Sequence, residues 1–140
     1  MKTIKTLFIM LALGMATTAT AQEKGYSYTA YYSYGTASGC SGKNVAYVSP
    51  IVSHTFEYYL DRSYVDSRDY DNKSGDLERK WAKKCEAKFN IDKTYCFGHG
   101  PDNWYESRSE ADEERDEEIA NLKRKGYTVY DSFSFGFYFD

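Results

Sequence analysis

Two segments of the chain alternate aromatic side chains with small or polar ones, and this alternation most limits the folds open to it. Residues 25–34 read GYSYTAYYSY, and residues 127–139 read YTVYDSFSFGFYF. Because successive side chains of a strand point to opposite faces, a period of two predicts β-strands. Residues 44–52 read NVAYVSPIV and are apolar at both parities. That pattern predicts a strand covered on both faces, which we expect to pair with the first.

Apolar side chains recur every fourth residue after Asp76, at Leu77, Trp81, Cys85 and Phe89. This spacing places them on one face and predicts an amphipathic helix, capped by Ser74 or Asp76. Residues 53–75 mix tyrosine and aspartate without a clear period. We therefore expect a long loop there, with at most one helical turn.

A second helix is predicted near the end of the chain. Ser107 and Glu110 have the spacing of a capping box, and Gly126 is placed to end the helix. Acidic residues crowd the first half of this segment and basic residues its last turn, as the helix dipole favours. Residues 93–99, between the two helices, predict a short strand.

The expected order of elements is therefore β-β-α-β-α-β, with the long loop before the first helix. Because crossover connections between parallel strands are right-handed, we expect both helices to lie on one face of the sheet. The predicted fold class is α+β. It would be a two-layer sandwich of a mixed sheet of about four strands with two helices on one face.

The first 21 residues have the three parts of a secretory signal peptide. Lys2 and Lys5 precede an apolar run over residues 7–15, and Ala19-Thr20-Ala21 forms a cleavage site. The apolar run is shorter than the roughly 20 residues that cross a bilayer. We therefore expect residues 1–21 to be cleaved and residues 22–140 to form one domain without a membrane span. The expected location is the periplasm or the extracellular space.

The charge of the chain bears on its partners. Removal of residues 1–21, which hold two lysines and no acidic residue, changes the net charge from −3 to −5. A net negative domain is not expected to bind nucleic acid. Its length suits a single domain, and we expect a monomer.

The three cysteines are Cys40, Cys85 and Cys96. In an oxidising compartment we expect one disulfide and one thiol left over. We favour a Cys85–Cys96 bridge, because a short turn after the first helix would bring the next strand back past Cys85. Either pairing with Cys40 is the alternative. No CxxC or HxxxH pair is present, so the sequence predicts no zinc site and no cofactor.

His99 lies between two glycines, and Asp102 follows it closely. A histidine and an aspartate can do acid–base chemistry or hold a metal, which would make this a small hydrolase or a metal-dependent enzyme. We favour the simpler interpretation of a tight turn, because glycine and aspartate are common turn residues.

Charged side chains gather in three further places. Five aspartates occur at positions 61, 66, 69, 71 and 76, but no register among them fits an EF-hand, so we favour a solvated loop over a calcium site. Residues 78–88 carry five basic and two acidic side chains, and residues 110–118 carry seven acidic and one basic. A partner could bind either patch. We favour two helices that lie side by side and offset each other's charge, or two solvated faces.

Tyrosine is the residue that suggests a function. Four tyrosines of the first strand share one parity: Tyr26, Tyr28, Tyr32 and Tyr34. With helices on the other face only, they would form an open aromatic surface, to which Trp104 of a nearby loop could add. The alternative is that they only pack within the sheet. The resulting hypothesis is a non-catalytic binding or interaction module for an envelope glycan, peptide or protein. The alternatives are the enzyme centred on His99 and Asp102, and a structural envelope protein.

Cleavage after Ala21 would leave Gln22 as the first residue of the exported chain. We expect intact-mass analysis of protein recovered outside the cytoplasm to show a chain that starts at Gln22, with or without cyclisation. Exported protein that retains Met1 would contradict the signal peptide.

Overall fold

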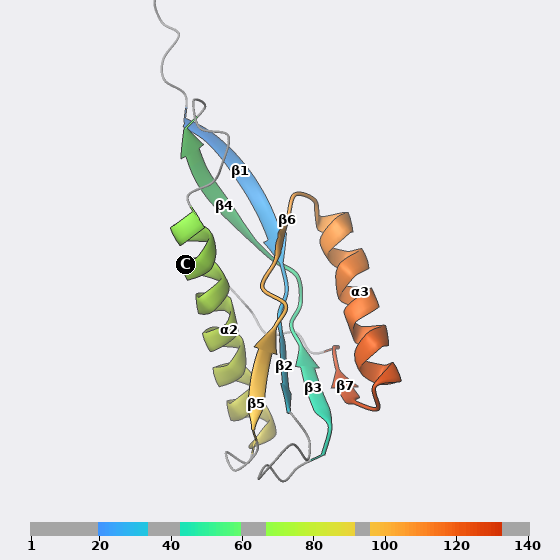
Figure 1. The fold of residues 1–140 in the computed structure, drawn as a ribbon. Coiled ribbons are helices and arrows are strands. Elements are labelled where there is room, and N and C mark those ends of the chain that lie inside the picture. Colours follow the sequence, from blue (N-terminus) through green and yellow to red (C-terminus); the bar gives the residue numbers. More distant parts are fainter. Residues whose placement is uncertain (1–19, 34–42, 60–66, 92–95, 133–140) are drawn as a thin grey trace, which may run out of the picture.

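The computed structural model describes residues 20–33, 43–59, 67–91 and 96–132, which form seven strands and two helices (Figure 1). The strands are β1 (Thr20–Ser27), β2 (Ala30–Ser33), β3 (Val45–Val48), β4 (Val52–Tyr59), β5 (Phe97–Gly100), β6 (Trp104–Tyr105) and β7 (Thr128–Tyr130). The helices are α2 (Ser67–Phe89) and α3 (Arg108–Arg124). The α+β class and the order of the predicted elements are confirmed.

The strands form two sheets, and three continuous lengths of chain each contribute one strand to each sheet. One sheet has the order β4-β1-β6, and the other, a mixed sheet of four strands, has the order β5-β2-β3-β7. β1 continues into β2, β3 into β4, and β5 into β6, with breaks at residues 28–29, 49–51 and 101–103. The breaks lie next to one another, and we call them the crease. Across it, the Ser49 amide donates to the Thr29 carbonyl at 2.8 Å and the Thr29 amide to Ser49 Oγ at 2.9 Å.

The two helices lie on opposite faces of the four-stranded sheet, so the prediction that they share one face is wrong. Ala30 of β2 packs with Ile119 and Leu122 of α3. Its neighbour Tyr31 packs with Trp81 and Cys85 of α2. Because neighbouring residues of a strand point to opposite faces, the sheet is the middle of three layers. Figure 1 shows the strands between α2 and α3.

The strand order explains this arrangement. β4 and β6 both run antiparallel to β1, and β7 runs parallel to β3, so each helix connects parallel strands. The connection through α2 crosses from β4 to the opposite edge, and the connection through α3 crosses back to β7 beyond β3. Since such connections are right-handed in nearly all proteins, two crossings in opposite directions put their helices on opposite faces.

The first helix begins earlier than the sequence predicts. α2 starts at Ser67 and β4 occupies Val52–Tyr59, so the expected long loop over residues 53–75 is wrong. Of the five aspartates assigned to that loop, those at 69, 71 and 76 are part of α2, and those at 61 and 66 lie outside the described residues. The apolar stripe is confirmed: Leu77, Trp81 and Cys85 are buried. The indole of Trp81 donates to the Tyr47 carbonyl at 2.9 Å.

The second helix has the predicted ends. Ser107 Oγ accepts from the Glu110 amide at 3.1 Å, and Gly126 has a φ of +88°, where an L side chain would be strained. Arg115 ties α3 to the strands, because its guanidinium donates to the Ser49 carbonyl at 2.7 Å and the Asp131 carbonyl at 2.8 Å. The final strand is confirmed at Thr128–Tyr130, and the phenylalanines beyond residue 132 lie outside the described residues. Neither described helix is long and apolar enough to cross a membrane.

The predicted Cys85–Cys96 disulfide is wrong, because Cys85 is a free thiol. Its side chain is 0% exposed among Tyr31, Tyr47 and Trp81, on the buried face of α2. This burial raises the pKa of the Cys85 thiol to about 12. Since the thiolate is the reactive form, Cys85 is inert near neutral pH. Cys96 is not a free thiol, and Cys40 lies outside the described residues.

With Cys85 excluded, Cys40 is the one candidate left in the chain to bridge Cys96. We expect no alkylation of the native protein, one adduct on Cys85 after unfolding without reduction, and three adducts after reduction. Peptide mapping without reduction should recover a Cys40–Cys96 pair. Alkylation of Cys96 in unreduced protein would contradict this pairing.

Two glycines provide a matched test of the packing. A Cβ at Gly25 of β1 would lie 2.8 Å from the Phe56 ring and 3.2 Å from the Trp104 ring. We expect Gly25→Ala to lower the free energy of unfolding by about 1–3 kcal/mol through overpacking. A Cβ at Gly75 of α2 would meet only the Arg79 side chain, at 3.6 Å, so Gly75→Ala should raise it by about 0.5–1 kcal/mol. Urea denaturation of both variants measures the difference, and equal effects would refute the packing.

Candidate functional site

Two of the tyrosines predicted to form an open face, Tyr28 and Tyr32, do share a face, but α3 covers it. Tyr28 is 2% exposed, and its hydroxyl donates to the Glu114 carbonyl of α3 at 3.0 Å. Tyr32 is half-buried and packs against the same cluster. Tyr26 is half-buried on β1, with Lys24 Nζ 5.7 Å from its ring centre, and Tyr34 lies outside the described residues. Because Tyr28 is buried under α3, the prediction of an open tyrosine platform is wrong.

A groove remains between α3 and the β5–β6 edge of the sheet. Two hollows of about 250 and 350 Å³ adjoin there, and both are lined by Pro101 and Glu118. We call them together the α3 groove. The first is lined by Tyr32, Gly100, Pro101, Glu118, Leu122, Lys125 and Tyr127. The second is lined by Tyr28, Pro101, Asn103, Tyr105, Glu114, Glu117, Glu118, Asn121 and Arg124.

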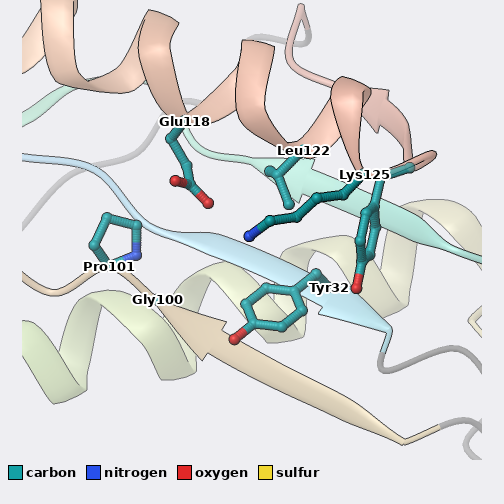
Figure 2. Close-up of a pocket in the computed structure, with 7 residues that line it drawn as sticks. Tyr32, Gly100, Pro101, Glu118, Leu122 and Lys125 are labelled. Atoms are coloured by element: carbon teal, nitrogen blue, oxygen red, sulfur yellow. The ribbon is translucent and has the colours of Figure 1, made fainter. Parts of the chain in front are cut away.

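The first hollow has charged and aromatic side chains facing each other across it. Figure 2 shows Glu118 and Lys125 pointing into it from α3, with Tyr32 facing them from β2 and Pro101 beside them. The Tyr32 and Tyr127 rings meet edge to face, with centroids 6.4 Å apart. A ligand here would contact ring surface on one side and charged groups on the other.

The second hollow is more polar. The rings of Tyr28 and Tyr105 are stacked at 6.4 Å with an interplanar angle of 5°. Burial, together with Tyr105 and the carboxylates of Glu118 and Glu114, raises the pKa of Tyr28, so its hydroxyl stays protonated and remains a donor. Asn103 and Asn121 add amides that both donate and accept hydrogen bonds.

The residues of the predicted enzyme centre are not brought together. His99 is exposed on β5 and stacks on Tyr31 at 5.1 Å, which places it on the α2 side of the sheet, away from the α3 groove. The Asp102 side chain is exposed, and within the described chain no hydrogen bond or ion pair joins it to His99. The centre of the His54 ring lies 4.8 Å from that of Phe56 and 6.2 Å from that of Trp104. Nor do three His, Cys, Asp or Glu residues of the described segments gather to hold a metal ion.

Trp104, predicted as a binding residue, is a core residue. It is buried with Val52, Phe56 and Leu77. Its indole donates to Ser74 Oγ at 2.9 Å, and that hydroxyl donates to the Asp102 carbonyl at 3.0 Å. These bonds hold the segment after β5 against α2.

Sequence reasoning missed most of the α3 groove. Glu114, Glu118, Asn121 and Lys125 recur at helical spacing, and this regularity could have indicated a single polar face beside the buried Ile119 and Leu122. Tyr105 lies in a predicted loop and Tyr127 is the first residue of the predicted last strand, and neither position gave such a signal. Comparisons with protein-family models, curated proteins and solved structures found no match to this chain.

Proposed function

We propose that the chain is an exported, non-catalytic binding domain and that its ligand lies in the α3 groove. The observation that carries this proposal is the lining of the groove. Tyr28, Tyr32, Tyr105 and Tyr127 line a hollow that also holds amides and carboxylates. Ligand sites are concave and combine aromatic surface with a few placed polar groups.

The lining suits a short segment of a glycan. A tyrosine ring offers an apolar face with a hydroxyl edge, which matches the C–H face and hydroxyl rim of a sugar ring. The carboxylates and the two asparagines provide acceptors and donors for sugar hydroxyls. The carboxylates and Asn121 stand on α3, and Tyr32 and Tyr105 stand on β2 and β6. Sites on such elements are held more firmly than sites on loops.

Export is part of the proposal, and the pattern of residues 1–21 supports it. In the sheet, β1 pairs with β4 from Thr20↔Tyr59 to Ser27↔Val52. Cleavage after Ala21 would remove two of these eight pairs and leave the register from Gln22 onward. The exported chain would therefore keep most of β1, which leads into the groove residue Tyr28.

Titration of the protein with a panel of soluble envelope oligosaccharides, followed by amide chemical shifts, tests this function. We expect the shifts to gather at α3 and β5–β6. Tyr32→Ala should weaken binding by about tenfold or more, which corresponds to ~1.4 kcal/mol, because it removes one wall of the groove. Tyr32→Phe keeps the ring and should weaken binding less.

The matched control is Tyr130→Ala. Tyr130 is 41% exposed, and its ring stacks on Tyr47 and is tilted against Phe89, on the α2 side of the sheet. Its removal should therefore leave binding unchanged. Melting temperatures of all variants establish that they are folded. If short peptides rather than oligosaccharides shift the α3 resonances, the site is right and the ligand class is wrong. Shifts that gather at His99 would overturn the site.

A further inference from the structure

The outward surfaces of the two helices carry opposite charge. Residues 110–118 of α3 hold seven acidic side chains and one basic one, and residues 78–88 of α2 hold five basic and two acidic ones. The sequence left open whether these helices neutralise each other. Since they lie on opposite faces of the sheet, they cannot do so within one molecule.

The acidic surface of α3 has one ion pair of its own, in which Arg108 Nε lies 3.9 Å from Asp112 Oδ2. Asp112, Glu113 and Asp116 are exposed and line neither hollow of the α3 groove. Arg115, the only basic residue among them, points inward to the carbonyls of Ser49 and Asp131. Like charges four residues apart on a helix destabilise it, and four such pairs occur here, at 110/114, 112/116, 113/117 and 114/118.

The basic surface of α2 is opposite to it in charge. Arg79 and Lys83 are exposed, opposite the buried stripe that packs on the sheet, and Lys88 is exposed in the last turn. Arg79 also forms an ion pair with Asp76 of the same helix. Of the two acidic residues in this stretch, Glu86 accepts a hydrogen bond from the Tyr31 hydroxyl at 3.1 Å and is thus turned toward the sheet. The outward side of α2 therefore keeps a basic excess.

We propose that the partner of these surfaces is a second copy of this chain, which docks the acidic surface of α3 on the basic surface of α2. Two copies in the same orientation place one molecule's α3 against the next molecule's α2. The two patches differ, so the contact is head-to-tail and leaves both end surfaces available for further copies. This association replaces the monomer expected from the sequence, and it does not depend on the α3 groove.

Each exposed ion pair contributes little and is screened by salt, so the association is weak and rests on several pairs. Sedimentation velocity of the exported chain at increasing concentration should show growing species in about 0.01 M salt, where charges act over ~30 Å. The species should return to monomer in about 1 M salt, where that range is ~3 Å. A monomer at every concentration in low salt overturns the proposal, and so does association that salt leaves unchanged.

Two charge-reversed variants make the test specific. One is Arg79→Glu with Lys83→Glu, which makes both outward surfaces acidic. The other is Glu113→Lys with Asp116→Lys, which leaves the residues lining the groove intact. We expect each variant alone to associate more than tenfold more weakly than the original chain in low salt. An equimolar mixture should associate again, because each variant presents the charge that the other needs.

The control is Lys43→Glu, which reverses an exposed charge outside both helices and should leave association unchanged. Circular dichroism establishes that the variants fold. Association of either helix variant alone to the original extent overturns the proposal, as does a mixture that stays monomeric. If the protein associates but does not bind glycans, only the proposal for the α3 groove is contradicted. If it binds glycans but does not associate, only the proposal for the docking surfaces is contradicted.

Discussion

The central length of chain, β1 and β2, hydrogen-bonds along both of its edges, to β4 and β6 in one sheet and to β3 and β5 in the other. A strand paired on both sides has only its two faces left for packing. In β2 the even residues turn to α3 and the odd residues to α2, so Ala30 and Tyr31, one residue apart, belong to different cores. The places of both helices follow from this alternation, because each helix must cover one of the two faces that a doubly paired strand leaves apolar.

The α3 groove follows from the path of α3. This helix starts after β6 at one edge of the sheet and returns the chain to β7 at the other. It packs on β7, β1 and β6, and the groove lies between α3 and the sheet edge at Gly100 and Pro101. The side chains that border this gap are the polar ones next to the buried stripe of α3, together with tyrosines whose rings lie partly beneath the helix.

Features that depend on residues a few positions apart could be predicted from the sequence. The order of strands in the sheet and the face that each helix covers could not. The spacing of Leu77, Trp81 and Cys85, the Ser107 cap and the Gly126 stop each depend on residues a few positions apart, and all are confirmed. β4 was missed because Val52 and Phe56, its buried residues, stand among polar and tyrosine residues that blur the period of two. The face of each helix was missed because it depends on the order of strands across the sheet. The same error made Tyr28 an exposed binding residue.

The crease brings Thr29, Ser49 and Pro101 from three different strands to one level of the fold. Regular ladder pairing stops there on all three strands at once, so the two sheets join along a line rather than as one continuous surface. Tyr28, Pro101 and Asn103 are crease residues and also line the α3 groove. Arg115 of α3 donates a hydrogen bond to the Ser49 carbonyl in the crease. The groove therefore lies at the line where the two sheets join. A small change in the angle between the sheets would alter the width of the groove directly, with no movement of a loop.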